Sequence, residues 1–193
     1  MSHYFIHDPT KKITERELTL NAFGYTYSFL AASGLFSCDE IDHASLILLQ
    51  HIPSIKGDLL DLGCGYGVIG IILAKLNDII LTQSDINPLA LRYAEINAKR
   101  NNITTNLIHS DSFENIPLYF DTITLNPPIH AGKETCFRMY KEAAHHLNAG
   151  GSFYIVIQKK HGASSTLDKL KELFSLSEIL YRKKGINVVR CSV

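Results

Sequence analysis

The order of apolar and polar positions divides the middle and the end of the chain into alternating strand-like and helix-like segments. Short apolar runs favour buried strands, whereas apolar residues that recur every three or four positions favour helices. Strands are predicted at residues 58–62, 79–85, 107–110, 121–125, 152–158, 179–182 and 186–191. Helices are predicted at residues 68–76, from 87 onward, at 133–147 and at 165–174. This alternation is typical of α/β folds.

The beginning of the chain has a different pattern. Residues 17–21 and 25–30 flank Ala22-Phe23-Gly24, which predicts a β-hairpin. Ser37-x-x-Glu40 matches a capping box, so a helix is expected to follow it as far as about His51. Residues 1–12 are expected to form an extended arm. We therefore expect one domain over residues 1–193, in which residues 1–33 form an N-terminal arm and hairpin.

The last two predicted strands are joined only by Lys183-Lys184-Gly185. A link this short is compatible with an antiparallel pair and not with a parallel crossover. The expected fold is therefore an α/β, Rossmann-like, seven-stranded and mostly parallel sheet. Its last strand is antiparallel, helices cover both faces, and a small β-hairpin precedes it.

Composition limits the classes of function. The chain has 193 residues, of which 46% are hydrophobic and 20% charged, which suits one globular domain with a substantial core. Its net charge is zero with His neutral, so any RNA contact requires a local basic patch or a shaped pocket. The four cysteines form no Cys-x-x-Cys pair, and no apolar run is long enough to span a bilayer. We expect a cytoplasmic monomer that binds no metal and no membrane.

The turn at residues 61–67, Asp-Leu-Gly-Cys-Gly-Tyr-Gly, follows one predicted strand and precedes a helix. Its glycines allow a tight turn and let a ligand approach main-chain N–H groups at the helix N-terminus. Ligands of Rossmann-like sheets bind at the carboxyl ends of the strands. The predicted ligand-binding residues of this turn are Asp61, Gly63, Cys64, Gly65 and Gly67.

Two classes of ligand compete for this turn, and a ligand-free tight turn is a third alternative. Gly65-x-Gly67-x-x-Gly70 matches the dinucleotide fingerprint, although a lone match is weak. Asp61 precedes the glycines, where a carboxylate favours a cationic amine over a pyrophosphate. Gly70 also lies well inside the predicted helix. A ligand with a methionine amine is therefore the better prediction.

Acidic residues end the next two predicted strands. Asp85, followed by Ile86, can accept hydrogen bonds from both hydroxyls of a ribose. Asp111, followed by Ser112, can accept from an adenine amino group. The alternatives are a helix-capping role for Asp85 and a simple turn at Asp111. Together with the glycine-rich turn, these residues predict S-adenosylmethionine as the cofactor.

Asn126-Pro127-Pro128-Ile129 ends the fourth strand of the predicted sheet. The two prolines lack N–H donors and stiffen the backbone. The side-chain oxygen of Asn126 and the carbonyl of Pro127 can then accept from one amino group, align its nitrogen and stabilise developing positive charge. We predict that Asn126 and Pro127 are catalytic and that Asn126 also borders the cofactor, with an ordinary turn as the alternative.

Taken together, the motifs resemble the class I methyltransferases of the methyltransferase small domain family. They are residues 61–67, Asp-Ile-Asn-Pro at 85–88, and Asn-Pro-Pro-Ile-His-Ala-Gly-Lys at 126–133. Gly34-Leu35-Phe36-Ser37, Ile41-Asp42 and Ser45 are similar to the segment that precedes the turn in this family. The resemblance implies methyl transfer to an exocyclic amine, namely N2 of an unpaired or flipped guanine in 16S ribosomal RNA.

The chain departs from the family pattern in two respects. Many amino methyltransferases have an aromatic residue after Asn-Pro-Pro, whereas this chain has Ile129, so Phe36 or His130 is expected to face the base. Larger ribosomal members carry an extra N-terminal domain that this chain replaces with a short arm and hairpin. The predicted substrate-binding residues are Phe36, Pro128, Ile129, His130 and Lys133. The predicted RNA contacts are Lys159-Lys160-His161 and Arg182-Lys183-Lys184.

Three other functions remain open at this point. A protein glutamine amide methyltransferase uses the same Asn-Pro-Pro chemistry, but Ile129 and the Gly-Leu-Phe-Ser segment favour RNA. A non-catalytic RNA-binding or assembly module is disfavoured by the intact Asp61, Asp85 and Asn126. A nicotinamide oxidoreductase has no use for the Asn-Pro-Pro turn.

Overall fold

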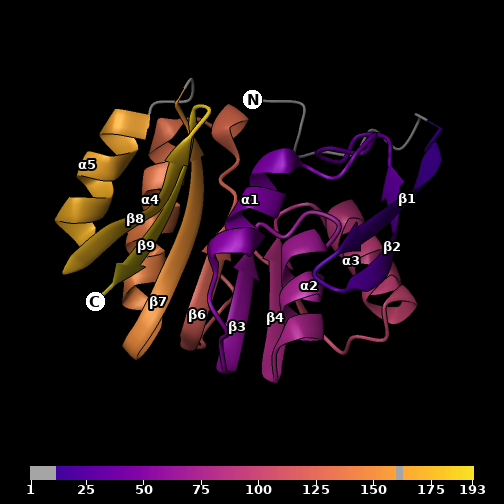
Figure 1. Ribbon diagram of the computed structural model, residues 1–193, viewed down its shortest axis with the longest axis horizontal. Helices are drawn as coiled ribbons and strands as arrows, with labels where there is room; N and C mark the ends of the chain where they lie inside the picture. Colours follow the sequence, from indigo (N-terminus) through magenta and orange to yellow (C-terminus); the bar gives the residue numbers. More distant parts are fainter. Residues whose placement is uncertain (1–11, 160–162) are drawn as a thin grey trace.

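The computed structural model describes residues 12–159 and 163–193 and contains a seven-stranded sheet in the order β5-β4-β3-β6-β7-β9-β8 (Figure 1). Every neighbouring pair from β5 to β7 is parallel, and β9 is antiparallel to both β7 and β8. The strands are β3 (Gly57–Leu62), β4 (Ile79–Asp85), β5 (Asn106–His109), β6 (Phe120–Leu125), β7 (Leu147–Gln158), β8 (Leu176–Lys183) and β9 (Ile186–Ser192). The predicted fold class is confirmed.

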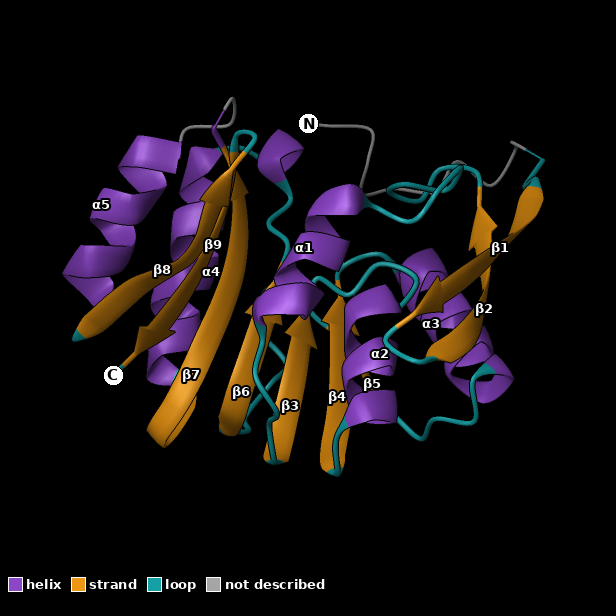
Figure 2. Ribbon diagram, viewed as in Figure 1, coloured by secondary structure: helices purple, strands orange, loops and turns teal. Residues whose placement is uncertain are grey.

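Helices cover both faces of the sheet (Figure 2). Successive strand residues point to opposite faces, so Leu59 joins one hydrophobic cluster and Leu60 the other. The first cluster includes the buried sides of α1 (His43–His51), α2 (Val68–Leu76) and α3 (Pro88–Arg100). The second includes those of α4 (Lys133–His145) and α5 (Ala163–Leu173). Burial on both faces explains why the central strands read as continuous apolar runs.

The hairpin of β1 (Glu15–Ala22) and β2 (Tyr25–Ala32) packs on α3 as predicted, although it does not join the large sheet. Asn97 accepts from Leu30 N at 2.7 Å and donates to Leu30 O at 3.0 Å, and Asn101 pairs in the same way with Ser28. The two amides thereby satisfy backbone groups on the free edge of β2. Asn97 Nδ2 also lies 2.8 Å from Tyr66 O, so this docking supports the glycine-rich turn.

The predicted start of α1 is wrong. Ser37 has a φ of 53°, and its hydroxyl donates to Glu40 O inside a turn. Asp42 is the N-cap, since its carboxylate accepts from Ser45 N at 2.7 Å. Asp, Ser and Thr compete for caps through the same hydrogen bond, so the pattern of residue types alone did not decide between them.

A second correction concerns the end of α4, which lies at His145 and not at residue 147. Leu147 already pairs with Phe120 in β7, and the next paired residues are Ser152 and Thr122. The Asn-Ala-Gly-Gly segment at 148–151, expected to follow the helix, therefore forms an irregularity within the strand. Leu147 keeps the apolar period of the helix, but it is buried as a strand residue.

Some predicted features lie outside the described residues, namely nearly all of the 1–12 arm, Lys160 and His161. Among the helices of the described residues, none has the length and apolarity that a membrane span requires.

Candidate functional site

A cavity of about 670 Å³ opens where β3, β4, β5 and β6 end. The loops after these strands line it, as expected for a parallel sheet. The structure brings most of the predicted site residues to this one cavity. These are Phe36, Gly63, Cys64, Gly65, Asp85, Ile86, Asp111, Ser112, Asn126, Pro127, Pro128, Ile129 and His130.

Asp61 does not line the cavity, which corrects its predicted contact with a ligand amine. It is 1% exposed and lies beneath the turn. One carboxylate oxygen accepts from Gly70 N at 2.9 Å and from Gln83 Nε2 at 3.1 Å. The other accepts from Thr124 Oγ1 at 3.2 Å. Asp61 therefore ties the first turn of α2 to β4 and β6, and positions the glycine-rich turn from below.

Gly67 also lies outside the cavity and shapes the turn instead of lining the site. Its φ is 95°, a conformation that favours glycine, and it forms the N-cap of α2. An added Cβ would lie 2.9 Å from Ile71 Cδ1 and 3.3 Å from Ala94 Cα. Gly70 allows an equally close approach, because its Cβ would lie 2.8 Å from Gln83 Nε2. Packing of α2 thus accounts for the glycine that completed the dinucleotide-like pattern.

The burial of Asp61 predicts a pH-dependent stability. Desolvation raises the pKa of Asp61 to about 6 from 3.8, although its three hydrogen bonds lower it. The folded state therefore holds the proton more tightly than the unfolded state. This stabilisation is complete below pH 3.8 and is lost as the pH rises through about 6. It amounts to about 3 kcal/mol.

Asp61→Asn is the matched variant, because an amide can accept from Gly70 N and donate to Thr124 Oγ1. Between about pH 4 and pH 7 the free energy of unfolding of the wild type should fall relative to that of the variant by about 3 kcal/mol. Urea unfolding at several pH values measures this difference. Parallel pH profiles for the two proteins would contradict the prediction.

Asp85 sits at the cavity wall with both carboxylate oxygens fixed. One accepts from Gly65 N at 2.9 Å and the other from Asn87 N at 2.8 Å. Burial raises the pKa of Asp85, whereas these backbone donors lower it. Each oxygen keeps acceptor capacity beyond its one backbone bond. This geometry suits a carboxylate that accepts from neighbouring hydroxyls of a ligand.

Asp111 reaches the cavity but is paired with Arg138, which sequence reasoning did not identify. Arg138 Nη2 lies 2.6 Å from Asp111 Oδ1, and both residues line the cavity. Nearby, Ser84 Oγ and Ser112 Oγ are buried, and neither has a hydrogen-bond partner within the described part of the chain. Both serines line the cavity, so they can bind a polar ligand there.

Asn126 is held by two residues that were not predicted to belong to the site. Its Nδ2 lies 3.0 Å from Asp42 Oδ2 and 3.0 Å from Ser45 Oγ. Both partners come from the start of α1 and line the same cavity. With the amide nitrogen turned toward these acceptors, the Asn126 side-chain oxygen is directed away from them. The Asp42-x-x-Ser45 spacing before an apolar run was the signal that could have identified this helix start.

Phe36 and His130, the two predicted replacements for the missing aromatic residue, both line the cavity. Phe36 is 48% exposed. Its loop is tied to the glycine-rich turn, because Tyr66 Oη donates to Ser37 O at 3.1 Å. An aromatic surface therefore borders the Asn-Pro-Pro turn, although Ile129 itself provides none.

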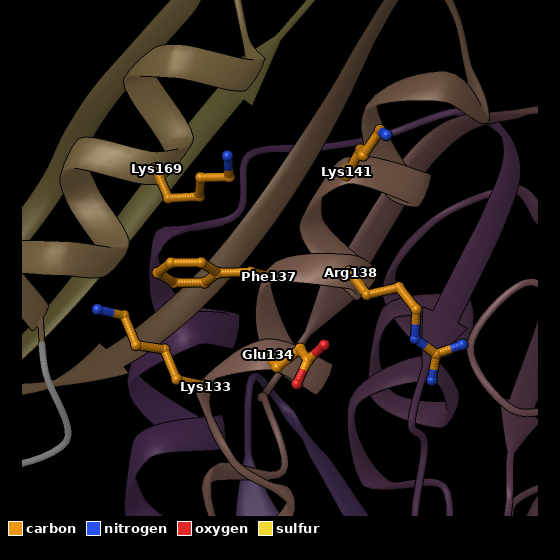
Figure 3. A pocket seen from close by; sticks show the side chains of 6 residues that line it. All are labelled: Lys133, Glu134, Phe137, Arg138, Lys141 and Lys169. Carbon is orange, nitrogen blue, oxygen red and sulfur yellow. The ribbon is translucent and has the colours of Figure 1, made fainter.

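Lys133 is the third predicted residue outside the cavity. Its Nζ lies 5.1 Å from the centroid of the Phe137 ring, in a shallow groove beside α5. Figure 3 shows Lys133, Phe137 and Lys169 on this side of α4, with Arg138 pointing away from them. Lys133 therefore does not contact a ligand inside the cavity, which corrects that prediction.

Nothing at the site indicates covalent or metal chemistry. Burial raises the pKa of the Cys64 thiol, which disfavours the reactive thiolate. Within residues 12–159 and 163–193, no group of three or more His, Cys, Asp or Glu side chains is arranged to hold a metal ion. The chemistry at hand is hydrogen bonding by fixed acceptors.

Comparison with known proteins gives consistent matches. The profile of the methyltransferase small domain family matches residues 26–190. The uncharacterized protein YbxB of Bacillus subtilis is 37% identical over 97% of this chain and 96% of its own length. Ribosomal RNA small subunit methyltransferase C is 35% identical in Vibrio cholerae and 40% in Aeromonas hydrophila. These matches cover 69% and 66% of this chain, which spans only 41% and 39% of those two relatives.

Solved structures show the same fold. The T. thermophilus 16S rRNA N2 guanine methyltransferase RsmC, solved with AdoMet and guanosine, aligns with a TM-score of 0.83 at 24% identity. The alignment covers 95% of this chain and 52% of that one. A ribosomal protein L11 methylase from Lactobacillus delbrueckii aligns with a TM-score of 0.62 at 19% identity. At these identities the likeness is one of fold.

Proposed function

Since the chain belongs to the methyltransferase small domain family, we propose that it is an S-adenosylmethionine-dependent methyltransferase of ribosomal RNA, acting on N2 of a guanine in 16S rRNA. The observation that carries the reaction type is the orientation of Asn126. Its amide nitrogen faces Asp42 and Ser45, so its oxygen is available to accept from a substrate amino group. The single-domain organisation, the monomeric state and the cytoplasmic location stay predictions.

The cavity fits S-adenosylmethionine. Asp85 offers acceptors for hydroxyl groups, and the unpartnered hydroxyls of Ser84 and Ser112 offer buried donors and acceptors. A buried polar group without a partner costs about 1–3 kcal/mol, so a polar ligand at these atoms is favoured. When bound, S-adenosylmethionine supplies an electrophilic methyl group. The proposed cofactor residues that line the cavity are Gly63, Cys64, Gly65, Asp85, Ile86, Asp111, Ser112 and Asn126.

The chain's own contribution to the reaction is positioning and charge stabilisation. We propose that Asn126 Oδ1 and the Pro127 carbonyl accept the two hydrogens of the amino group. A planar guanine amine has a delocalised, poor lone pair, so fixed acceptors help to align the nitrogen and stabilise its developing positive charge. No general base is needed first, because the proton can leave to water once the nitrogen carries the methyl group.

The guanine substrate is supported by two findings. The relatives named ribosomal RNA small subunit methyltransferase C share the family of this chain, and RsmC was solved with guanosine. Phe36 and His130 border the Asn-Pro-Pro turn, where a flipped base can stack. Because the chain spans about two fifths of those relatives, its RNA target is set by this proposal and not by their names.

Mass spectrometry of nucleosides tests the proposal. The purified protein, S-adenosylmethionine and 16S rRNA or small ribosomal subunits from a strain lacking this protein should yield N2-methylguanosine. Methylation of a protein glutamine would favour the alternative amide substrate, for which Ile129 and the Gly-Leu-Phe-Ser loop are poorly suited. Absence of methyl transfer to any RNA or protein fraction would favour the non-catalytic binding module.

RNA contact is predicted at the turn between β8 and β9, where Lys183 and Lys184 are exposed. This turn adjoins the cavity, since Ile186 pairs with Gln158, a cavity residue. Replacing both lysines with alanine should weaken RNA binding and lower the salt slope by about 1–2, because each neutralised phosphate adds about 0.7–0.9. Binding of S-adenosylhomocysteine should not change. Fluorescence anisotropy with labelled rRNA across a salt titration measures the effect.

Lys56→Ala/Lys75→Ala is the control for the lysine pair. It removes the same charge at the opposite edge of the sheet, because Lys56 precedes β3 and Lys75 lies at the end of α2. Equal salt slopes for the two double variants would show that the β8–β9 turn is merely a solvated hairpin. The RNA contact would then be sought at Lys12 and Arg16 or at the groove beside Lys133.

A further inference from the structure

We propose that Asp42 and Ser45 are positioning residues that orient the Asn126 amide, and that the charge of Asp42 makes the Asn126 oxygen a stronger acceptor. This inference deepens the proposed function and rests on it. It assigns a role in methyl transfer to two residues that do not belong to the Asn-Pro-Pro turn. They reach that turn from a helix N-terminus more than eighty positions earlier in the chain.

A single oxygen organises the contact. Asp42 Oδ2 accepts from Ser45 N at 2.7 Å, from Ser45 Oγ at 2.9 Å and from Asn126 Nδ2 at 3.0 Å. Ser45 Oγ donates its hydrogen to Asp42, so its lone pairs face Asn126 Nδ2 at 3.0 Å. The three side chains thus form a closed set of hydrogen bonds.

This arrangement permits only one orientation of the Asn126 amide. If the amide were reversed, its oxygen would face the Asp42 carboxylate and a hydroxyl whose hydrogen is already committed. Neither group could donate to it, and the oxygen atoms would repel each other. The nitrogen must therefore face Asp42 and Ser45, and the oxygen is held ready for a substrate amine without reorganisation.

The negative charge of Asp42 adds a second effect. A hydrogen bond to a carboxylate is stronger than one to a neutral oxygen and polarises its donor. Electron density in the Asn126 amide then shifts toward its oxygen, which becomes a better acceptor as positive charge develops on the substrate nitrogen. Asp42 is only half-buried and Ser45 is buried, so the clamp lies at the inner wall of the cavity.

Asp42→Asn removes this charge and keeps the geometry. Asn caps helices as well as Asp does, and its amide oxygen can take the place of Asp42 Oδ2 toward Ser45 and Asn126. We expect kcat to fall about tenfold, the difference between a charged and a neutral hydrogen bond. KM for RNA, affinity for S-adenosylhomocysteine and the thermal midpoint should stay near those of the wild type.

Asp39→Asn is the matched control, because it removes the same charge three positions earlier. Asp39 is exposed and pairs with Arg16, away from Asn126. A double-mutant cycle adds specificity: in an Asn126→Ala background, Asp42→Asn should have no further effect, because it acts through the missing amide. Equal kcat for Asp42→Asn and Asp39→Asn, or an undiminished effect of Asp42→Asn without Asn126, would overturn the proposal.

A spectroscopic measurement separates this inference from the proposed function. The side-chain ¹H–¹⁵N signals of Asn126 are identified by their loss in Asn126→Ala. They should shift in Asp42→Asn and in Ser45→Ala but not in Asp39→Asn. If the wild type methylates no guanine, the proposed function fails while these signals still test the clamp. Signals that do not move in Asp42→Asn would refute the clamp whether or not the enzyme is active.

Discussion

Replacing Asn126 with alanine is expected to lower the rate of methyl transfer by about 10²–10³, the range for loss of one preorganised polar contact. The Asn126 oxygen is one of two proposed acceptors for the substrate amine, and no titratable group is needed to remove a proton beforehand. Single-turnover measurements with rRNA give the rate of the chemical step. Near-normal turnover in this variant would refute the mechanism.

The same variant should stay folded and keep its affinity for the cofactor. Asp42 retains both hydrogen bonds from Ser45 when Asn126 is shortened, so the start of α1 remains capped. Thermal unfolding and calorimetry with S-adenosylhomocysteine check these two properties. Asn148→Ala is a suitable control, because Asn148 donates to Asp121 outside the cavity. It removes an amide of the same size without affecting the proposed acceptors.

Asp85→Ala is expected to weaken S-adenosylhomocysteine binding by about 1.5–3 kcal/mol, the range for hydrogen bonds to a charged group. This corresponds to roughly 10- to 150-fold in Kd. The variant loses the proposed acceptor for the ribose hydroxyls and the support that Asp85 gives to Gly65 N and Asn87 N. Titration calorimetry measures the change directly.

Asp78→Ala controls for loss of an acidic residue, since Asp78 is exposed at the other end of β4. The wild type should bind S-adenosylhomocysteine and should not bind NAD. Equal affinities for the Asp85 and Asp78 variants would remove Asp85 from the binding site. Tight NAD binding without homocysteine binding would instead favour the dinucleotide interpretation of the glycine-rich turn.

Much of the fold was predictable from local patterns. The bounds of α2 and β4 were predicted to the residue, and Asn87 with Pro88 marked the start of α3. These elements have strong local determinants: a continuous apolar run, a glycine-rich turn, or a cap followed by proline. Where two local signals competed, as with Ser37 and Asp42, the choice failed because either residue type can cap a helix.

The sequence by itself also determined which loops meet. Parallel strands place their carboxyl ends at one edge, so the segments around Asp85, Asp111 and Asn126 had to converge once the sheet was recognised. Only the tertiary structure decided how the side chains are directed. It placed Asp61 beneath the turn, Lys133 against Phe137, and Asp42 with Ser45 against Asn126. The physical reason is range: backbone periodicity and capping act within a few residues, whereas these contacts depend on how distant elements pack.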